Sequence, residues 1–276
     1  MAYEGYRSLR VEVDAGVAAV RFDHPPVNLM DAALIGDLFR LGPELAADDG
    51  VRVVVFRSAD PEFFIAHADV TLILELPDVD PENVAEMSAF HRMVELYREL
   101  PKVTIGVIEG IARGGGSEFL LSLDMRFGAV GKCVLAQPEV ALGILPGGSG
   151  TQRLPRLMGR SRALEVVLGC DDFDALEAER YGWINRALPA DEIGPFVDRL
   201  ARRIASFPAR ALALAKQSVH AAEPGFEPGL VAEQRAFAET LRSDEARQRM
   251  ARFMAIGGQT REGELDLVAL TARLLD

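Results

Sequence analysis

The chain has 276 residues, which is long enough for one large hydrophobic core or for a domain with a smaller appendage. Its 30 Lys and Arg residues against 42 Asp and Glu residues give a formal net charge of −12. This charge disfavours nucleic acids and anionic membrane surfaces as partners, although a helix N-terminus or a few local cations can still bind a small anionic ligand.

The cysteines and the N-terminus limit the class of protein further. Cys133 and Cys170 form no CxxC pair and no Cys/His cluster, so the sequence predicts neither a disulfide framework nor a metal site. The first residues lack the basic and apolar segments of a secretory signal, and no apolar run has the roughly 18 residues that a membrane helix needs. We therefore expect a cytoplasmic protein that does not span a membrane.

The first half of the chain alternates strand and helix patterns. Residues 8–22 alternate apolar and polar side chains around Gly16, which predicts a β-hairpin, and a helix follows with Asn28 or Asp31 as its cap. Further strands are predicted over 51–57, 102–108 and 125–130, with a helix over 81–100. Apolar strands that alternate with helices indicate a layered α/β core with parallel pairing.

After about residue 148 the strand pattern gives way to helical periodicity. Helices are predicted over 149–157, 160–168, 174–181, 190–205, 208–221, 227–241, 243–255 and 261–275. This change favours a domain boundary within 190–208. We expect an α/β core over residues 1–195 and a helical C-terminal region over residues 196–276.

A glycine-rich segment follows the second of the buried strands. Gly114, Gly115 and Gly116 precede Ser117 and Glu118 and open an apolar helix. The free amides of a helix N-terminus favour negative charge, so they can stabilise an oxyanion as it forms. A tight strand-to-helix turn without a ligand is the alternative interpretation of such a run.

Two other segments carry groups suited to the same chemistry. In the apolar stretch from Phe63 to Asp69, the amide of Ala68 is a candidate second donor and Asp69 is suited to cap a helix. Glu139 lies between Pro138 and an apolar run, a setting that often desolvates a carboxylate, raises its pKa and suits it to proton transfer. For Glu139 taken alone, an exposed side chain at a turn is the simpler interpretation.

Together the segments resemble the crotonase (enoyl-CoA hydratase/isomerase) superfamily over roughly residues 8–255, because they occur in one order and at spacings typical of that family. The resemblance rests on Phe63 to Asp69, Gly114 to Glu118, Asp124 to Phe127, Gln137 to Glu139 and Pro146 to Leu154, with support from Asn28, Ala178 to Gly182, Asn185, Pro208 and Lys216. It implies an α/β fold with a ββα spiral core and a helical C-terminal region. Family members are commonly trimers or hexamers, so a homotrimer or hexamer is expected.

The resemblance also implies the reaction and the residues that perform it. An acyl-CoA thioester would place its carbonyl between the amides of Ala68 and Gly115, Glu118 would activate water, and Glu139 would deliver a proton to Cα. The expected reaction is the reversible hydration of a 2-enoyl-CoA, with coenzyme A as part of the substrate and no separate cofactor or metal. The remaining residues expected to contact the substrate are Ala66, His67, Asp69, Gly114, Gly116, Pro138, Gly147 and Lys216.

Three departures from the family pattern bear on this interpretation. His67 stands where the family usually has glycine, one extra residue separates Asp124 from Glu139, and the chain beyond Ile256 does not follow the usual ending. His67 could narrow the channel, contact the ligand or face away, and a non-catalytic packing role is favoured because isolated histidines usually have one.

Three other functions are alternatives to a hydratase. An isomerase would need only Glu139 as a base that moves a proton between Cα and Cγ. A non-catalytic acyl-CoA binder would explain His67, but it would have no use for both Glu118 and Glu139. A Rossmann dinucleotide enzyme is disfavoured because the glycine-rich segment lacks the GxGxxG order.

Overall fold

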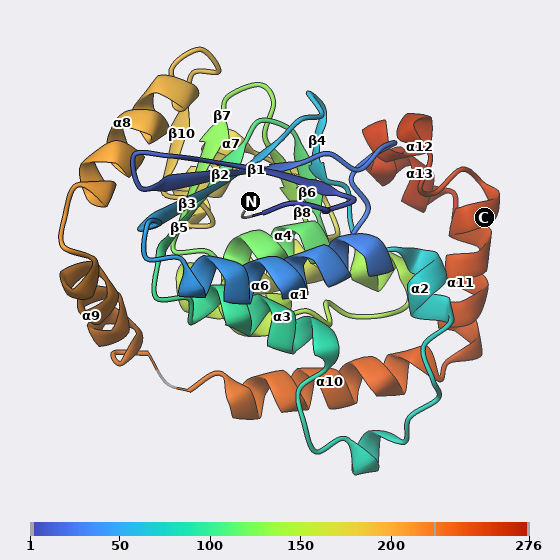
Figure 1. Cartoon of the computed structure of the whole chain (residues 1–276). Helices are drawn as coiled ribbons and strands as arrows, with labels where there is room; N and C mark the ends of the chain where they lie inside the picture. The colour runs from blue at the N-terminus through green and yellow to red at the C-terminus, as the bar shows by residue number, and fades with distance from the viewer. Residues whose placement is uncertain (1–2, 224, 275–276) are drawn as a thin grey trace.

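Two β-sheets, built mostly from the first half of the chain, form the framework of the computed structural model, which describes residues 3–223 and 225–274 (Figure 1). The larger sheet has the order β1-β2-β3-β5-β7-β10 and the smaller one the order β4-β6-β8-β9. Within the larger sheet only β1 and β2 pair antiparallel, and every other neighbouring pair is parallel. The strands are β1 (Leu9–Asp14), β2 (Val17–Phe22), β3 (Val53–Ser58), β4 (Phe63–Ile65), β5 (Val103–Ile108), β6 (Ile111–Arg113), β7 (Met125–Ala129), β8 (Val134–Ala136), β9 (Phe173–Asp174) and β10 (Arg186–Leu188).

The chain repeats one unit as it moves between the sheets. Strands β3, β5 and β7 of the larger sheet are each followed directly by a short strand of the smaller sheet, namely β4, β6 and β8. Each short strand then leads to a helix or a 3-10 turn. The expected ββα spiral is therefore present, and each repeat ends with a strand-to-helix connection at the same side of the small sheet.

The helices fall into a group around the sheets and a C-terminal group. The first group contains α1 (Ala32–Ala47), α2 (Val70–Leu74), α3 (Ala89–Arg98), α4 (Gly115–Leu121), α5 (Gly150–Met158), α6 (Arg160–Gly169) and α7 (Ala175–Tyr181), with 3-10 turns η1 (Pro81–Asn83) and η2 (Glu139–Leu142). The second contains α8 (Ile193–Ala205), α9 (Ala209–His220), α10 (Glu227–Leu241), α11 (Asp244–Ala255), α12 (Arg261–Leu265) and α13 (Leu267–Ala272). No helix within the described ranges has the length and apolarity needed to cross a bilayer.

Local chemistry explains where the N-terminal elements begin and turn. The hairpin turns at Ala15 and Gly16, which both have positive φ, as a two-residue turn between twisted strands requires. Asp31, not Asn28, caps α1 by accepting from the amides of Ala33 and Leu34. The side-chain amide of Asn28 instead donates to the carbonyl of Phe63 at 3.1 Å and so joins the segment between β2 and α1 to the small sheet.

Three predicted boundaries are wrong. The helix predicted over 81–100 is a 3-10 turn followed by α3, because Ser88 and His91 form a capping box that begins the helix at Ala89. The helix predicted over 261–275 is two short helices, because the side chain of Asp266 caps a new helix; residue 275 lies outside the described residues. The strands β9 and β10 interrupt the region predicted to be helical, and each is too short to show a period.

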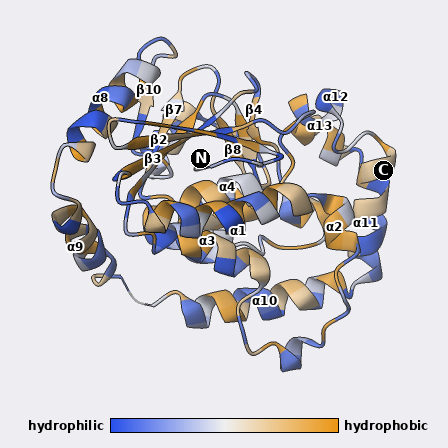
Figure 2. Cartoon of the chain, in the orientation of Figure 1, coloured by the Kyte–Doolittle hydropathy of each residue, from blue (hydrophilic) through white to orange (hydrophobic). Residues whose placement is uncertain are grey.

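The main core lies between the larger sheet and the helices that cover it. Phe22, Phe56, Tyr97 and Phe119 are fully buried there. Phe119 meets each of the other three rings edge to face, with centroids 5.2–5.8 Å apart. Helix α8 covers the opposite face of the same sheet through an apolar stripe that includes Ile193 and Val197. The strands are accordingly coloured mainly as hydrophobic in Figure 2.

The chain leaves this core after α8 and returns to it. Helix α9 contains no buried residue, whereas α10 packs on α5 and η1, and α11 packs on α2 and η2 (Figure 1). Helices α12 and α13 follow and lie on the same side of the molecule as α11 (Figure 1). The C-terminal helices therefore reach the strand-to-helix connections at which the candidate site lies.

Candidate active site

Two backbone amides from different repeats lie next to each other. Ala68 follows β4 and forms an isolated β-bridge with Met30 that fixes its backbone. In this bridge, Met30 N donates to His67 O at 2.9 Å and Asp69 N donates to Met30 O at 3.2 Å. Gly115 is the first residue of α4, and a Cβ atom on it would lie 3.3 Å from Ala68 N. Within residues 3–223 and 225–274, neither the Ala68 nor the Gly115 amide donates to a protein acceptor. Both donors are therefore free to bind one external oxygen.

Gly114 and Gly116 are required by space and by backbone angle. Gly114 has a φ of +45°, and a Cβ atom there would lie 2.6 Å from Oε1 of Glu139. A Cβ atom on Gly116 would overlap the carbonyl oxygen of Ile65, at the end of β4. The glycine-rich segment therefore lets α4 begin directly beside the residues that precede α2.

Glu118 lies within α4 and is 3% exposed. Its Oε1 accepts from the amides of Gly148 and Gly150, each at 2.8 Å. The pKa of Glu118 is raised to about 8, first by burial and then by the charge of Glu233, while the Gly150 and Gly148 amides oppose the rise. The two amides favour the ionised form of this buried carboxyl.

Glu139 is the first residue of η2 and faces the same space from the other side. Its Oε2 is buried and has no hydrogen-bond partner among the described residues. Burial raises the pKa of Glu139 well above its ordinary value, and the charge of Glu118 adds to the rise. The two carboxyls are therefore unequal: Glu118 has two donors that stabilise a negative charge, whereas Oε2 of Glu139 has none and favours a proton.

A small cavity extends from these groups toward the C-terminal helices. It has a volume of about 30 Å³ and begins at His67, Ala68 and Glu139. Its other walls are Val70, Ile73, Pro138, Leu142, Ile144, Phe253, Leu267 and Thr271. Ala68 and Glu139 thus share a mainly apolar space, part of which is built by α11 and α13.

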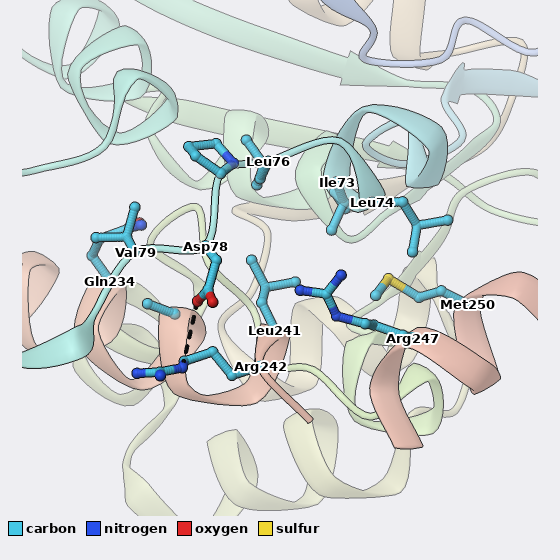
Figure 3. Close-up of a pocket in the computed structure, with 12 residues that line it drawn as sticks. Ile73, Leu74, Leu76, Asp78, Val79, Gln234, Leu241, Arg242, Arg247 and Met250 are labelled. Atoms are coloured by element: carbon cyan, nitrogen blue, oxygen red, sulfur yellow. Dashed lines mark ion pairs between the residues drawn. The ribbon is translucent and has the colours of Figure 1, made fainter. Parts of the chain in front are cut away.

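A second hollow lies on the other side of Ile73. Figure 3 shows Ile73 and Leu74 of α2 facing Leu241 of α10 and Met250 of α11, with the Asp78–Arg242 ion pair at the edge. This hollow has a volume of about 110 Å³. Ile73 lines both spaces and therefore forms part of the wall between them.

His67 points toward the C-terminal segment. Its Nε2 lies 3.0 Å from Oε1 of the fully buried Glu264, and its Nδ1 lies 2.7 Å from the carbonyl oxygen of Ala68. Burial lowers the pKa of His67, but the charge of Glu264 and the hydrogen bonds to Glu264 and to the Ala68 carbonyl together outweigh this and leave the pKa raised. The same Glu264 oxygen accepts from the amide of Gln259, whose side chain binds Val70 N and Asp69 Oδ1. His67 thus links the residues around Ala68 to the C-terminal helices.

The other predicted contact residues divide into two groups. Ala66 is buried beside the donors, Asp69 caps α2 as predicted, and Gly147 packs against Phe237 of α10. Lys216, in contrast, is not brought to the site: its Nζ lies 2.9 Å from Asp124 in a separate cavity of about 460 Å³.

Several polar residues around the site could not be predicted from the local sequence. Gly148 and Gly150 lie in the segment from Pro146 to Leu154, which does not show that their amides bind Glu118, and Glu233 and His91 lie outside the motifs. The signal for Glu233 is its place in α10, three residues after buried Leu230 and four before buried Phe237. A carboxylate on the buried face of an amphipathic helix requires a partner, which here is found at the site.

A ββα spiral whose helix N-terminus and neighbouring loop offer two free amides, beside two buried carboxyls, defines a protein of the crotonase type. The chain belongs to the enoyl-CoA hydratase/isomerase family, whose sequence model matches residues 12–257. This result confirms the resemblance inferred from the motifs.

Individual relatives agree with the family assignment. The chain is 28% identical to the probable enoyl-CoA hydratase of Mycobacterium bovis, over 90% of this chain and 95% of that protein. It is 29% identical to the short-chain-enoyl-CoA hydratase of Clostridium acetobutylicum, over 88% and 93% of the two chains. A crystal structure from Streptomyces avermitilis, which carries a provisional enoyl-CoA hydratase name, superposes with a TM-score of 0.92 at 43% identity and covers 98% and 99% of the chains. The predicted α/β crotonase fold is therefore confirmed.

Proposed function

We propose that the chain catalyses the reversible syn hydration of a trans-2-enoyl-CoA to the 3-hydroxyacyl-CoA. The observation that carries this proposal is the unequal hydrogen bonding of two neighbouring buried carboxyls, Glu118 and Glu139. Hydration needs one group that accepts a proton from water and one that supplies a proton to carbon, and this pair offers one of each. The family and the names of its relatives agree with the reaction.

The thioester oxygen would bind between the amides of Ala68 and Gly115. Negative charge develops on this oxygen when water adds to Cβ, because the electrons of the double bond move toward the carbonyl. A single donor placed at such an oxygen contributes ~3 kcal/mol to the stability of the transition state. Neither amide has a competing acceptor among the described residues, so the donors do not have to be released before substrate binds.

Glu118 and Glu139 would then complete the addition. The ionised Glu118 takes a proton from water while the water oxygen bonds to Cβ, and the protonated Glu139 gives its proton to Cα. The pair ends the forward reaction with its proton on the other carboxyl, so the same two groups serve the reverse reaction with their roles exchanged.

The test is to mix the purified protein with crotonyl-CoA and to follow the loss of the conjugated thioester absorbance. We expect hydration, and we expect Glu118→Gln and Glu139→Gln each to lower kcat by roughly 10²- to 10⁴-fold while CoA binding remains. No hydration above background with enoyl-CoA substrates of several lengths would overturn the proposal. Full activity in either variant would overturn the role given to that residue.

An enoyl-CoA isomerase is the second candidate, and the unpartnered oxygen of Glu139 is the observation that favours it. A base that alone moves a proton between Cα and Cγ needs such an oxygen. Product analysis with a 3-enoyl-CoA separates the two reactions. A non-catalytic acyl-CoA binder has lost its main support, because the side chain of His67 is paired with Glu264.

We further propose the setting in which the enzyme works. The acyl-CoA thioester is the partner, coenzyme A enters as part of the substrate, and no separate cofactor takes part. Assembly as a homotrimer or hexamer and a cytoplasmic location complete the proposal. The exposed apolar side chains of α9, Leu214 and Val219, support the assembly.

A further inference from the structure

Four consecutive backbone amides alternate between two buried carboxylates. The amides of Gly148 and Gly150 donate to Oε1 of Glu118, each at 2.8 Å. The amides of Ser149 and Thr151 point the other way and donate to Glu233, at 2.6 Å and 3.0 Å. The segment from 148 to 151 is thus held between one carboxylate of the active site and one carboxylate of the C-terminal region.

Glu233 is a fixed group in a closed setting. It lies on α10, is 3% exposed, and also accepts from the hydroxyl of Thr151. Its Oε1 lies 2.9 Å from Nε2 of His91, a fully buried residue on α3. These contacts join three helices, α3, α5 and α10, at a single carboxylate. A side chain held by this many partners has little freedom to move.

The backbone of the segment from 148 to 151 has a conformation that its contacts must stabilise. Ser149 has a φ of +100°, in the region that a non-glycine residue adopts only when its surroundings impose it. Its amide binds Glu233 and its hydroxyl accepts from Nε of Arg153 at 2.7 Å. If Glu233 were removed, the backbone could relax, and the Gly148 and Gly150 amides on either side would turn away from Glu118.

We infer that Glu233 is a positioning residue for the reaction: it fixes the loop from 148 to 151, whose alternate amides orient Glu118. This inference rests on the proposed function, since it assigns to Glu233 a task in the hydration step. It gives the C-terminal helix α10 a part in catalysis without any contact with substrate.

The charges around Glu118 decide whether a change at Glu233 raises or lowers the pKa of Glu118. Three charged or titratable side chains face Glu118: Glu139 from η2, Glu233 from α10 and Arg153 from α5. Two residues of α3 bind two of these side chains: His91 binds Glu233, and Glu95 binds Arg153. The charge of Glu233 raises the pKa of Glu118, whereas the Gly148 and Gly150 amides lower it. In Glu233→Gln the charge is lost, but the side-chain oxygen can still accept from the loop and keep these amides near Glu118, so the pKa of Glu118 should fall. Activity that requires ionised Glu118 would then begin at a lower pH.

The test compares Glu233→Gln with a matched control, Asp37→Asn. Asp37 on α1 is another buried carboxylate that accepts from two amides and a hydroxyl, those of Arg7 and Ser8, and it lies outside the site. We expect kcat of Glu233→Gln on crotonyl-CoA to fall by roughly 10- to 100-fold, as for a catalytic group displaced by a fraction of an ångström, while KM changes little. The acidic limb of its pH profile moves to lower pH, whereas Asp37→Asn keeps the wild-type kcat and profile.

The ionisation of Glu118 can also be measured directly, without an activity assay. The titration of Glu118 can be followed by carbon NMR of glutamate labelled at the carboxyl carbon, with Glu118→Gln to assign the signal. We expect the Glu118 signal to titrate at lower pH in Glu233→Gln than in the wild-type protein. An unmoved titration together with wild-type kcat would overturn the inference. If the wild-type protein instead hydrates no enoyl-CoA, the proposed function fails, and the NMR titration still decides whether Glu233 controls Glu118.

A second variant separates geometry from charge and serves if Glu233→Gln does not fold. Glu233→Asp keeps the negative charge but shortens the side chain, so that it no longer reaches both the Ser149 and the Thr151 amides. We expect kcat to fall and the acidic limb of the pH profile to move to higher pH, because the charge remains while the Gly148 and Gly150 amides, which lower the pKa of Glu118, are displaced. A Glu233→Asp protein with the wild-type kcat would show that the loop needs no such support.

Discussion

A buried carboxyl that must ionise to act also affects the stability of the protein. The pKa of Glu118 is about 8 in the folded chain, whereas its ordinary value is 4.5. Between these values the folded state keeps a proton that the unfolded state has released. The free energy of unfolding therefore decreases as the pH rises from about 4.5 toward 8, because stability decreases with pH wherever the native state binds more protons.

Glu118→Gln should remove this penalty. Its amide oxygen can still accept from Gly148 and Gly150, and it carries no charge to desolvate. We expect the variant to be more stable than the wild-type protein at pH 8 by about 1 kcal/mol or more, since one pKa unit corresponds to about 1.4 kcal/mol. Urea unfolding between pH 5 and pH 9 measures the effect. The same decline of stability with pH in both proteins would contradict it.

The residues of the site differ in how far they could be predicted from the sequence. Ala68, Gly115, Glu118 and Glu139 lie in local motifs, and the structure brings them to one place. Glu233 could not be placed in the same way, because its Ser149 partner is 84 positions away and no local spacing indicates the contact. The same holds for Glu264, which lies 197 positions from His67.

At the scale of elements, the segment containing α12 supports the loop that carries the Ala68 amide. Glu264 binds His67 and the amide of Gln259, and it is fully buried. Glu264→Ala would leave a buried imidazole and an amide without their acceptor. Since removal of one partner of a buried pair costs about 3–5 kcal/mol, we expect a loss of stability of this size and a lower kcat.

A double-mutant cycle tests whether the effect comes from the pair. In the protein with both His67→Ala and Glu264→Ala, no unpaired imidazole remains, so the loss of stability should be smaller than the sum of the two single losses. Urea unfolding of the four proteins gives the coupling energy. Additive losses would mean that His67 and Glu264 contribute independently, contrary to this prediction.

Ile73 of α2 should limit the length of the acyl group. The cavity beside Glu139 has a volume of about 30 Å³, and Ile73 separates it from the 110 Å³ hollow in Figure 3. Ile73→Ala would join the two spaces. We expect kcat/KM for octenoyl-CoA relative to crotonyl-CoA to rise roughly tenfold, the size typical of a small change in an apolar pocket.

Leu76→Ala is the matched control for this prediction, because Leu76 lines only the outer hollow. Its ratio of kcat/KM values should stay near that of the wild-type protein. An equal rise in both variants would place the limit on acyl length elsewhere.

The sequence predicts the long helices and strands but not the short strands of the small sheet. The long strands and most helices follow from their periodicity, which spans enough residues to be recognised. The strands of the small sheet have two or three residues each, so their pairing and not their composition defines them. Because the donor loops follow β4 and β6, the sequence indicated the loops through their motifs but not the sheet that positions them.

At the scale of the whole molecule, α9 packs only lightly on the rest of the described chain, next to β5. It has no buried residue, and Leu214 and Val219 are 51% and 68% exposed. Its main polar contact with the core is Lys216, which binds Asp124 beside the cavity of about 460 Å³. A 12-residue helix is only marginally stable in water, so α9 should be covered by another surface in solution.

A second copy of the chain is the partner that the expected trimer or hexamer supplies. Sedimentation velocity should therefore show a trimer or hexamer of the wild-type protein. The variant with Leu214→Asp and Val219→Asp should sediment as a smaller species, because charged side chains would have to be buried in the interface. Leu176→Asp, on the equally exposed surface of α7, is the control and should keep the assembly. A wild-type monomer, or an assembly that withstands the α9 changes but not the α7 change, would contradict the prediction that α9 lies between the copies.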